Sequence, residues 1–414
     1  MFMNTKFRLI LQNFLEFAIW GAYLISMGTY LSGVGLGSHI GWFYSVQGIV
    51  CIFMPALMGM IADRLMEGQR VLSLCHLFAG AFMIAASLYA FQAGDAPRFP
   101  VLFSLYALSV SFFMPTIALS YSVAYSALKE AGLDVVKSFP SIRVWGTVGF
   151  ICSMIAVDLL GFAQSANQLY FSAAIGVLLG IYSFTLPPCA VSKKAPEGNW
   201  VDALGLRAFA LFKEKRMAIF FIFSMFLGVS LQITNAFANG YLTNYFGGID
   251  KYAGTFGVEH ANILISLSQL SETSCILLIP FFLKRYGIKN VMLISMFAWV
   301  LRFALLGLGN PGTGVWMLIL SMIVYGVAFD FFNISGSLYV EKETTPAIRA
   351  SAQGVFMMMT NGLGATLGSY AAGKVVDMYG WPDSWFIFAA YALVVAILFA
   401  LVFRYKHNAE EVKA

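Results

Sequence analysis

Long apolar runs follow one another along the whole sequence, and each is long enough to cross a lipid bilayer. A membrane-spanning helix needs roughly 20 consecutive, mostly apolar residues. Twelve such runs can be marked, six on each side of a longer polar segment at 189–216. They lie at 8–31, 39–62, 71–92, 99–125, 142–162, 168–188, 217–243, 260–282, 291–309, 315–339, 350–375 and 384–403. Because these spans and their connections take up nearly all of the 414 residues, no large soluble domain fits beside them.

The composition excludes the other large classes of protein. Only 11% of the residues are charged and 60% are hydrophobic, whereas soluble domains are about 25% charged. A water-soluble enzyme of this size could not cover so much apolar surface, and disordered chains have the opposite composition. The predicted fold class is therefore an all-α polytopic membrane protein.

The positive charges lie almost entirely on one side of this arrangement. With the N-terminus in the cytoplasm, all but five of the 25 lysines and arginines fall in cytoplasmic segments, as the positive-inside rule requires. We therefore expect both chain ends in the cytoplasm. The net charge of +5 follows from these cytoplasmic segments and does not indicate a nucleic-acid partner.

The two halves of the chain have similar sequence patterns. Each half has six spans, and a short basic connection follows the second span of each, at 59–70 and at 283–289. Repeats of this kind are common in transporters, which are often built from duplicated halves. We predict an N-terminal six-helix bundle at 1–188, a cytoplasmic connector at 189–216 and a C-terminal six-helix bundle at 217–414.

The connection after the second span carries a spaced motif. It consists of Gly59, Asp63, Arg64 and Arg70. This motif resembles the loop motif of the major facilitator superfamily, although its last residues depart from that pattern. The resemblance implies the major-facilitator fold and a gating role for these four residues. Taken alone, the motif could also be an ordinary basic turn.

Longer segments resemble the bacterial nucleoside:H+ symporter family and together extend over most of the chain. They read FPSIRVWGTVGF at 139–150, RMAIFFIFSM at 216–225, LQITN at 231–235, SQLSE at 268–272, YGIKNVM at 286–292 and YGVAFDFFNISG at 325–336. The resemblance implies proton-coupled nucleoside uptake across the bacterial inner membrane by alternating access. It also implies a substrate site near the membrane midplane, between the two halves.

Two acidic residues lie near the middle of apolar spans, where ionised groups are costly and are candidates for function. Glu272 lies in the eighth span, with Gln269 three residues earlier on the same helical face. Asp330 lies in the tenth span, next to the face that carries Tyr325 and Phe329. A carboxyl group beside aromatic rings can bind ribose hydroxyls while a ring stacks on the base. We predict that all five contact substrate, and that Glu272 or Asp330 carries the coupled proton; structural roles are the alternative.

Arg143 begins the fifth span, with Thr147 and Phe150 on the same helical face. By itself Arg143 could equally be a boundary residue whose charge reaches the membrane surface. The family resemblance favours substrate binding by these three residues.

A polar stripe runs along the seventh span at Gln232, Asn235 and Asn239. The family resemblance implies that Gln232 and Asn235 contact substrate. We expect Asn239 to hold helices together or to lie at the outer mouth. In the eleventh span, Gly364 and Gly368 match the small-residue pattern that lets helices approach closely.

Glu16 in the first span is a third candidate for proton coupling. It shares a helical face with Asn13 and Trp20. A buried, hydrogen-bonded carboxyl group or a boundary acid is the alternative, and the sequence leaves this open. The four histidines show no metal-ligand spacing: they are His39, His76, His260 and His407.

The prediction is a transporter and not an enzyme, because no nucleophile–base set, metal cluster or phosphate loop is found. A sugar:H+ symporter of the same superfamily is the alternative among transporters, and a receptor or scaffold is the alternative outside them. We expect a nucleoside, protons and the lipid bilayer as partners, no cofactor, no metal, no nucleic acid, and a monomer. Purine or pyrimidine preference and the proton stoichiometry stay open.

Overall fold

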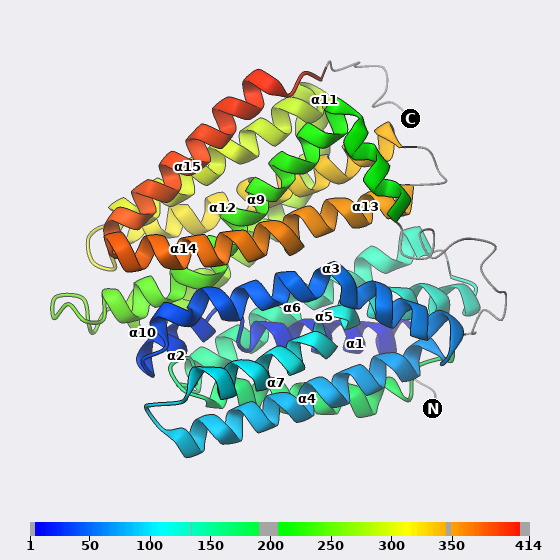
Figure 1. Cartoon of the computed structure of the whole chain (residues 1–414), viewed down its shortest axis with the longest axis horizontal. Helices are drawn as coiled ribbons and strands as arrows, with labels where there is room; N and C mark the ends of the chain where they lie inside the picture. Colours follow the sequence, from blue (N-terminus) through cyan, green and yellow to red (C-terminus); the bar gives the residue numbers. More distant parts are fainter. Residues whose placement is uncertain (1–4, 134, 190–205, 345–348, 406–414) are drawn as a thin grey trace. The chain divides into compact units, whose positions relative to one another are not determined.

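Helices make up nearly all of the described chain (Figure 1). The structure is a computed structural model of the whole chain, and it describes residues 5–133, 135–189, 206–344 and 349–405. No strand occurs within these ranges. Inside a membrane, helices satisfy their own backbone N–H and C=O groups, which is why a chain of apolar runs folds in this way. The chain divides into two compact units, Met1–Glu197 and Gly198–Ala414, and each is described by itself.

The first unit is built around α1, which packs on α5, α6 and α7. The helix α4 packs on α5 and α7, and α3 packs on α5. In chain order the helices are α1 (Thr5–Gly21), α2 (Met27–Gly33), η1 (Gly37–His39), α3 (Ile40–Arg64), α4 (Gly68–Ala93), α5 (Phe99–Glu130), α6 (Val135–Leu159) and α7 (Asn167–Ser183).

The second unit is built around α11 and α12, which pack along each other. Its helices are η2 (Leu206–Lys213), α9 (Lys215–Gly240), η3 (Tyr241–Tyr245), α10 (Phe256–Glu259), α11 (Ala261–Leu308), α12 (Val315–Glu343), α13 (Arg349–Met357), η4 (Met358–Gly364), α14 (Ala365–Tyr379) and α15 (Trp381–Val402). The long element α11 consists of two helices, because the chain turns at Gly287, whose φ is +74°. Glycine adopts this left-handed conformation without the penalty that a side chain brings.

Several expected spans have a different form in the structure. The first is divided by a turn at 22–26, the eighth and ninth are the two parts of α11, and the eleventh is interrupted by the π-helix η4. Within the described ranges, eight helices are long and apolar enough to cross a membrane. The number of twelve crossings stays a prediction. Most of the predicted connector, at 190–205, lies outside the described residues.

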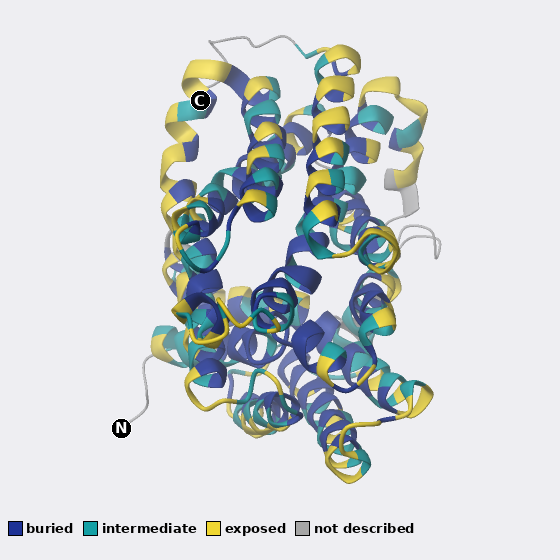
Figure 2. Cartoon of the chain, turned by 90° about the vertical axis from the view of Figure 1, so that its left-hand side faces the viewer, coloured by how far each residue is buried: buried dark blue, intermediate teal, exposed yellow. Residues whose placement is uncertain are grey.

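The exposed faces of the helices are themselves apolar. Exposed and buried residues alternate along individual helices (Figure 2), and the exposed set includes Leu277, Met378 and Leu401. Such a surface suits lipid tails, because the bilayer core imposes no penalty on apolar side chains.

Glycines allow the closest helix contacts in both units. A Cβ atom at Gly149 of α6 would lie 2.0 Å from the backbone oxygen of Phe14 on α1. In the second unit, Cβ atoms at Gly364 and Gly368 would collide with the backbone of α9, at Met225 and Val229. The predicted close approach of the eleventh span to a neighbour is therefore confirmed, and that neighbour is α9.

Candidate functional site

The second unit holds a cluster of polar and aromatic side chains around Tyr325 of α12. Tyr325 is buried, and its hydroxyl is within hydrogen-bonding reach of the Gln269 side chain on α11. Glu272, Arg302 and Asp330 all lie close enough to interact electrostatically with this hydroxyl. The two helices come close here because a Cβ atom at Gly326 would lie 2.5 Å from the backbone oxygen of Ser271. The structure thus brings together five predicted site residues: Gln269, Glu272, Tyr325, Phe329 and Asp330.

Aromatic rings form one side of this cluster. The rings of Tyr325 and Phe329 lie 5.8 Å apart between centroids and are nearly parallel, at 13°. The Trp299 ring meets Tyr325 edge-on, with centroids 6.0 Å apart. The two rings are therefore stacked on each other, and a heterocyclic base can extend such a stack of aromatic rings.

The two acids of the cluster interact with each other. Asp330 and Glu272 lie close enough to interact electrostatically, and Asp330 is only 3% exposed. Within the described residues, the Oδ2 atom of Asp330 has no hydrogen-bond partner. Two neighbouring carboxylates repel each other when both are ionised. An unpartnered buried oxygen is costly unless it binds a proton or a ligand.

Arg302 is a site residue that the sequence analysis did not include. The Arg302 side chain is 1% exposed. It donates from Nη1 to the backbone oxygen of Ser321 at 2.5 Å. Its guanidinium carbon lies 4.7 Å from the centroid of the Tyr325 ring. The signal was present in the sequence, since Arg302 is an ionisable residue inside the apolar run at 291–309. Its position, two residues from the middle of that run, makes it as strong a candidate as the two acids.

The polar stripe on α9 divides into two parts. Asn235 donates from Nδ2 to Oε1 of Gln232 at 3.0 Å, so these two amides form a pair. Asn239 instead donates from Nδ2 to Oδ1 of Asn262 on α11, at 2.6 Å. The prediction that Asn239 holds helices together is therefore confirmed.

In the first unit, Arg143 of α6 is held by aromatic side chains. It donates from Nε to the Tyr121 hydroxyl on α5 at 2.6 Å, and its guanidinium carbon lies 4.0 Å from the centroid of the Phe17 ring on α1. Phe150 is buried, with its ring 6.4 Å from Trp20 and edge-on to it. Thr147 is half-buried on the same helix. These three predicted residues belong to the first unit, and the other predicted substrate contacts belong to the second.

The predicted gating motif is partly helical. Gly59 lies within α3, which continues to Arg64, so the connection between α3 and α4 is shorter than the expected loop. The side chains of Asp63 and Arg64 lie outside the described residues. Arg70 forms an ion pair with Glu67, with 2.9 Å between Nε and Oε2, and is largely exposed.

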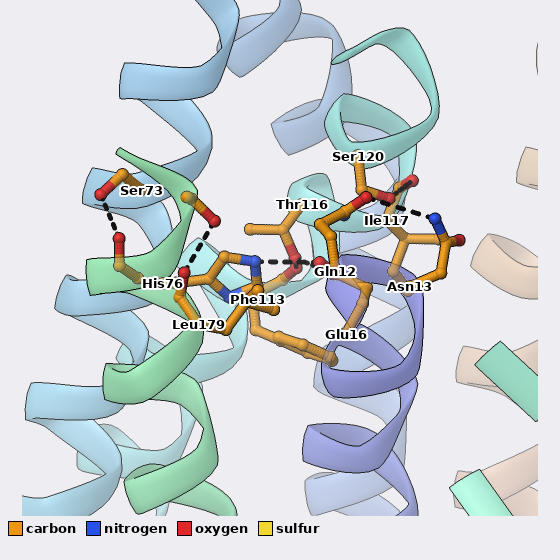
Figure 3. Close-up of polar contacts among 12 residues, drawn as sticks. Gln12, Asn13, Glu16, Ser73, His76, Phe113, Thr116, Ile117, Ser120 and Leu179 are labelled. Carbon is orange, nitrogen blue, oxygen red and sulfur yellow. Dashed lines mark hydrogen bonds and ion pairs between the residues drawn. The ribbon is translucent and has the colours of Figure 1, made fainter. Parts of the chain in front are cut away.

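Glu16 lies in a second buried polar cluster, inside the first unit (Figure 3). Its Oε2 atom is 2.9 Å from Nε2 of His76 on α4, and its Oε1 atom accepts a hydrogen bond from the Thr116 hydroxyl on α5 at 2.6 Å. All three residues have no exposed surface. Sequence spacing did not reveal this contact, because α4 and α1 bring His76 to an acid 60 residues away.

The fold and the buried acids, amides and rings define a membrane transporter of the major-facilitator type. The structure superposes on a crystal structure of the nucleoside transporter NupG with a TM-score of 0.89 and 48% sequence identity, covering 98% of this chain and 100% of that one. A family model described as nucleoside H+ symporter matches residues 3–408. The chain belongs to this family, as its sequence motifs predicted.

Two relatives from Escherichia coli K12 are similar over their full length. The nucleoside permease NupG is 49% identical, over 98% of this chain and 97% of that protein. The xanthosine permease is 46% identical, over 99% of each. Both are named as permeases and neither as an enzyme.

Proposed function

We propose that this chain takes up nucleosides together with protons across the bacterial inner membrane by alternating access. Membership of the nucleoside H+ symporter family supports the reaction, and the names of its permease relatives support the class of substrate. One structural observation carries the proposal for the site: a buried acid, Asp330, and a half-buried acid, Glu272, both lie within electrostatic reach of a tyrosine that also reaches an amide.

The proposed site supplies each kind of contact that a nucleoside needs. The parallel rings of Tyr325 and Phe329 stack on the base. Amide groups offer both donors and acceptors to its polar edge, and the carboxyl groups accept hydrogen bonds from ribose hydroxyls. The proposed substrate contacts are Arg143, Thr147, Phe150, Gln232, Asn235, Gln269, Glu272, Tyr325, Phe329 and Asp330.

Proton coupling rests on the repulsion between the two acids. A proton on Glu272 or Asp330 removes one of two neighbouring negative charges from a buried site, and that site then binds a neutral nucleoside at lower cost. The inward movement of one positive charge through 100 mV releases about 2.3 kcal/mol, which supports roughly 50-fold accumulation.

The test is uptake by proteoliposomes that carry the purified full-length chain. An inward proton gradient should drive accumulation of uridine or adenosine, and excess unlabelled nucleoside should compete while excess sucrose should not. Collapse of the proton gradient by an uncoupler should remove the accumulation. Competition by sucrose in place of nucleoside would instead establish the sugar:H+ symporter, and absence of any uptake would reject transport of both.

The placement in the membrane is part of the proposal. Both chain ends lie in the cytoplasm, the two six-helix bundles cover 1–188 and 217–414, and the chain works as a monomer. The one-sided distribution of lysine and arginine supports this orientation. The motif of Gly59, Asp63, Arg64 and Arg70 acts as a cytoplasmic gate. An epitope at either end should be reached by antibody only after the inner membrane is permeabilised.

A further inference from the structure

The Glu16 carboxyl group is enclosed by hydrogen-bonding side chains from two other helices. His76 on α4 meets its Oε2 atom at 2.9 Å, and Thr116 on α5 meets its Oε1 atom at 2.6 Å (Figure 3). None of the three side chains is exposed. Both carboxyl oxygens therefore have a partner deep inside the first unit, far from the acids of the Tyr325 cluster in the sequence.

The Thr116 hydroxyl can serve this carboxyl group in either protonation state. It has one hydrogen but two acceptors in reach, Oε1 of Glu16 at 2.6 Å and the backbone oxygen of Phe113 at 2.5 Å. A hydroxyl donates to one acceptor at a time while its lone pairs still accept. When Glu16 is ionised, Thr116 donates to it. When Glu16 is protonated on Oε1, its O–H group donates a hydrogen bond to the Thr116 oxygen. The Thr116 hydroxyl then donates its own hydrogen to the backbone oxygen of Phe113.

His76 completes the site as a fixed donor. Its Nδ1 atom has no hydrogen-bond partner within the described residues. Because a buried N–H group without an acceptor is rarer and costlier than a bare lone pair, we assign the hydrogen to Nε2, which donates to Oε2 of Glu16. The Phe113 ring lies 6.3 Å from the imidazole between centroids and packs against it. His76 therefore supports the carboxyl group in both of its states.

Few other titratable groups face this site. From α4, Cys75 lies within electrostatic reach of Glu16, and from α5, Tyr121 does so as well. From α6, Arg143 is bonded to Tyr121. Along α7 the titratable residues are Tyr170, which is exposed, and Tyr182, which donates to the backbone oxygen of Arg8.

We propose that Glu16 is a second proton-binding site of the transport cycle, with Thr116 as a two-way hydrogen-bond switch and His76 as its positioning residue. Loading forms an O–H bond at Oε1 of Glu16 with a proton from a hydronium ion, whose own O–H bond breaks and which is left as water, and the Thr116 hydrogen rotates from Glu16 to the Phe113 carbonyl. Release reverses these movements and returns the proton to a water molecule. This inference rests on the proposed proton-coupled transport, and it assigns a proton to the first unit in addition to the one carried by the second.

The deciding measurement is the number of protons moved per nucleoside. In proteoliposomes with a fixed uridine gradient, the opposing proton gradient that stops net flux gives this ratio. We expect Glu16→Gln to lower the ratio by one proton while uridine is still transported, because the amide keeps the shape of the side chain but cannot take up a proton. An unchanged ratio would overturn the inference and leave Glu16 as a structural residue.

A second variant covers the case in which Glu16→Gln does not fold. Thr116→Val removes a charge-assisted hydrogen bond from the ionised carboxylate and only a neutral one from its protonated form. The midpoint of the pH profile of uptake should therefore move to higher pH by about one unit. Ser120→Ala is the matched control, since Ser120 lies one turn away on α5 and donates to the backbone oxygen of Ile117 rather than to Glu16.

The outcomes separate this inference from the proposed function. A profile that stays in place in Thr116→Val, or that moves equally in Ser120→Ala, contradicts the switch. If the wild-type protein shows no proton-driven nucleoside uptake, the proposed function is rejected. The second proton site is then rejected as well, because it rests on that function.

Discussion

The guanidinium of Arg302 lies 4.7 Å from the centroid of the Tyr325 ring, although the two residues belong to different helices. Arg302 is nearly fully buried and donates to the backbone oxygen of Ser321 at 2.5 Å. A desolvated cation over an aromatic face contributes about 2 kcal/mol. This contact sets the orientation of the tyrosine around which Gln269, Glu272 and Asp330 gather.

We predict that Arg302→Gln raises the KM for uridine at least 10-fold, because Tyr325 loses the cation that holds its ring. Initial uptake rates over a range of uridine concentrations give this value. Lys374→Gln is the matched control, since Lys374 also lies over a tyrosine ring, at 5.9 Å from Tyr370, but is exposed. An equal effect of both substitutions would mean that the change is nonspecific.

Neutral amides in place of the two acids should separate proton coupling from substrate movement. In whichever of Asp330→Asn and Glu272→Gln removes the acid that carries the proton of the second unit, we expect uridine accumulation at 100 mV to fall roughly 50-fold, which is the share that one coupled proton supplies. Exchange of labelled for unlabelled uridine at equal concentrations should persist in at least one of them. Full accumulation in both variants would show that the coupled proton binds elsewhere.

We predict that the polar residues on α9 have two different functions: Gln232 binds substrate, and Asn239 holds helices together. Gln232→Ala removes an amide that accepts a hydrogen bond from Asn235, and we expect a 10-fold or greater increase in KM, since one hydrogen bond to substrate contributes about 1.5 kcal/mol. Asn239→Ala breaks the bond to Asn262 and should lower the melting temperature with little change in KM. Uptake kinetics measure the KM, and thermal unfolding in detergent measures the melting temperature. A raised KM in Asn239→Ala together with an unchanged KM in Gln232→Ala would contradict the proposed site.

Contact between α1 and α6 leaves no room for a side chain at Gly149. A Cβ atom there would lie 2.0 Å from the backbone oxygen of Phe14, so Gly149→Ala must push the helices apart and should destabilise the protein by about 1–3 kcal/mol. Gly33→Ala is the control, because nothing lies within 4 Å of its Cβ position. Melting temperatures of the two variants in the same detergent provide the comparison.

Much of the fold could be predicted from the sequence because the bilayer acts on each helix separately. Apolar runs of sufficient length must become helices in lipid, and clusters of lysine and arginine indicate which connections we expect in the cytoplasm. Extended motifs such as those around Arg143 and Asp330 also indicated the family that the comparison confirms. These properties are local, so they can be read along the chain.

The partners of each buried side chain were decided by the tertiary structure. Glu16 and His76 are 60 residues apart, and Arg302 meets Tyr325 across two helices. Helical periodicity shows which residues share a face, but the rotation of a helix about its own axis is set by packing, here by glycines such as Gly149 and Gly326 that allow backbones to touch. The sequence by itself therefore determined that ionisable groups lie within the membrane-spanning helices, and only the folded structure decided which of them meet.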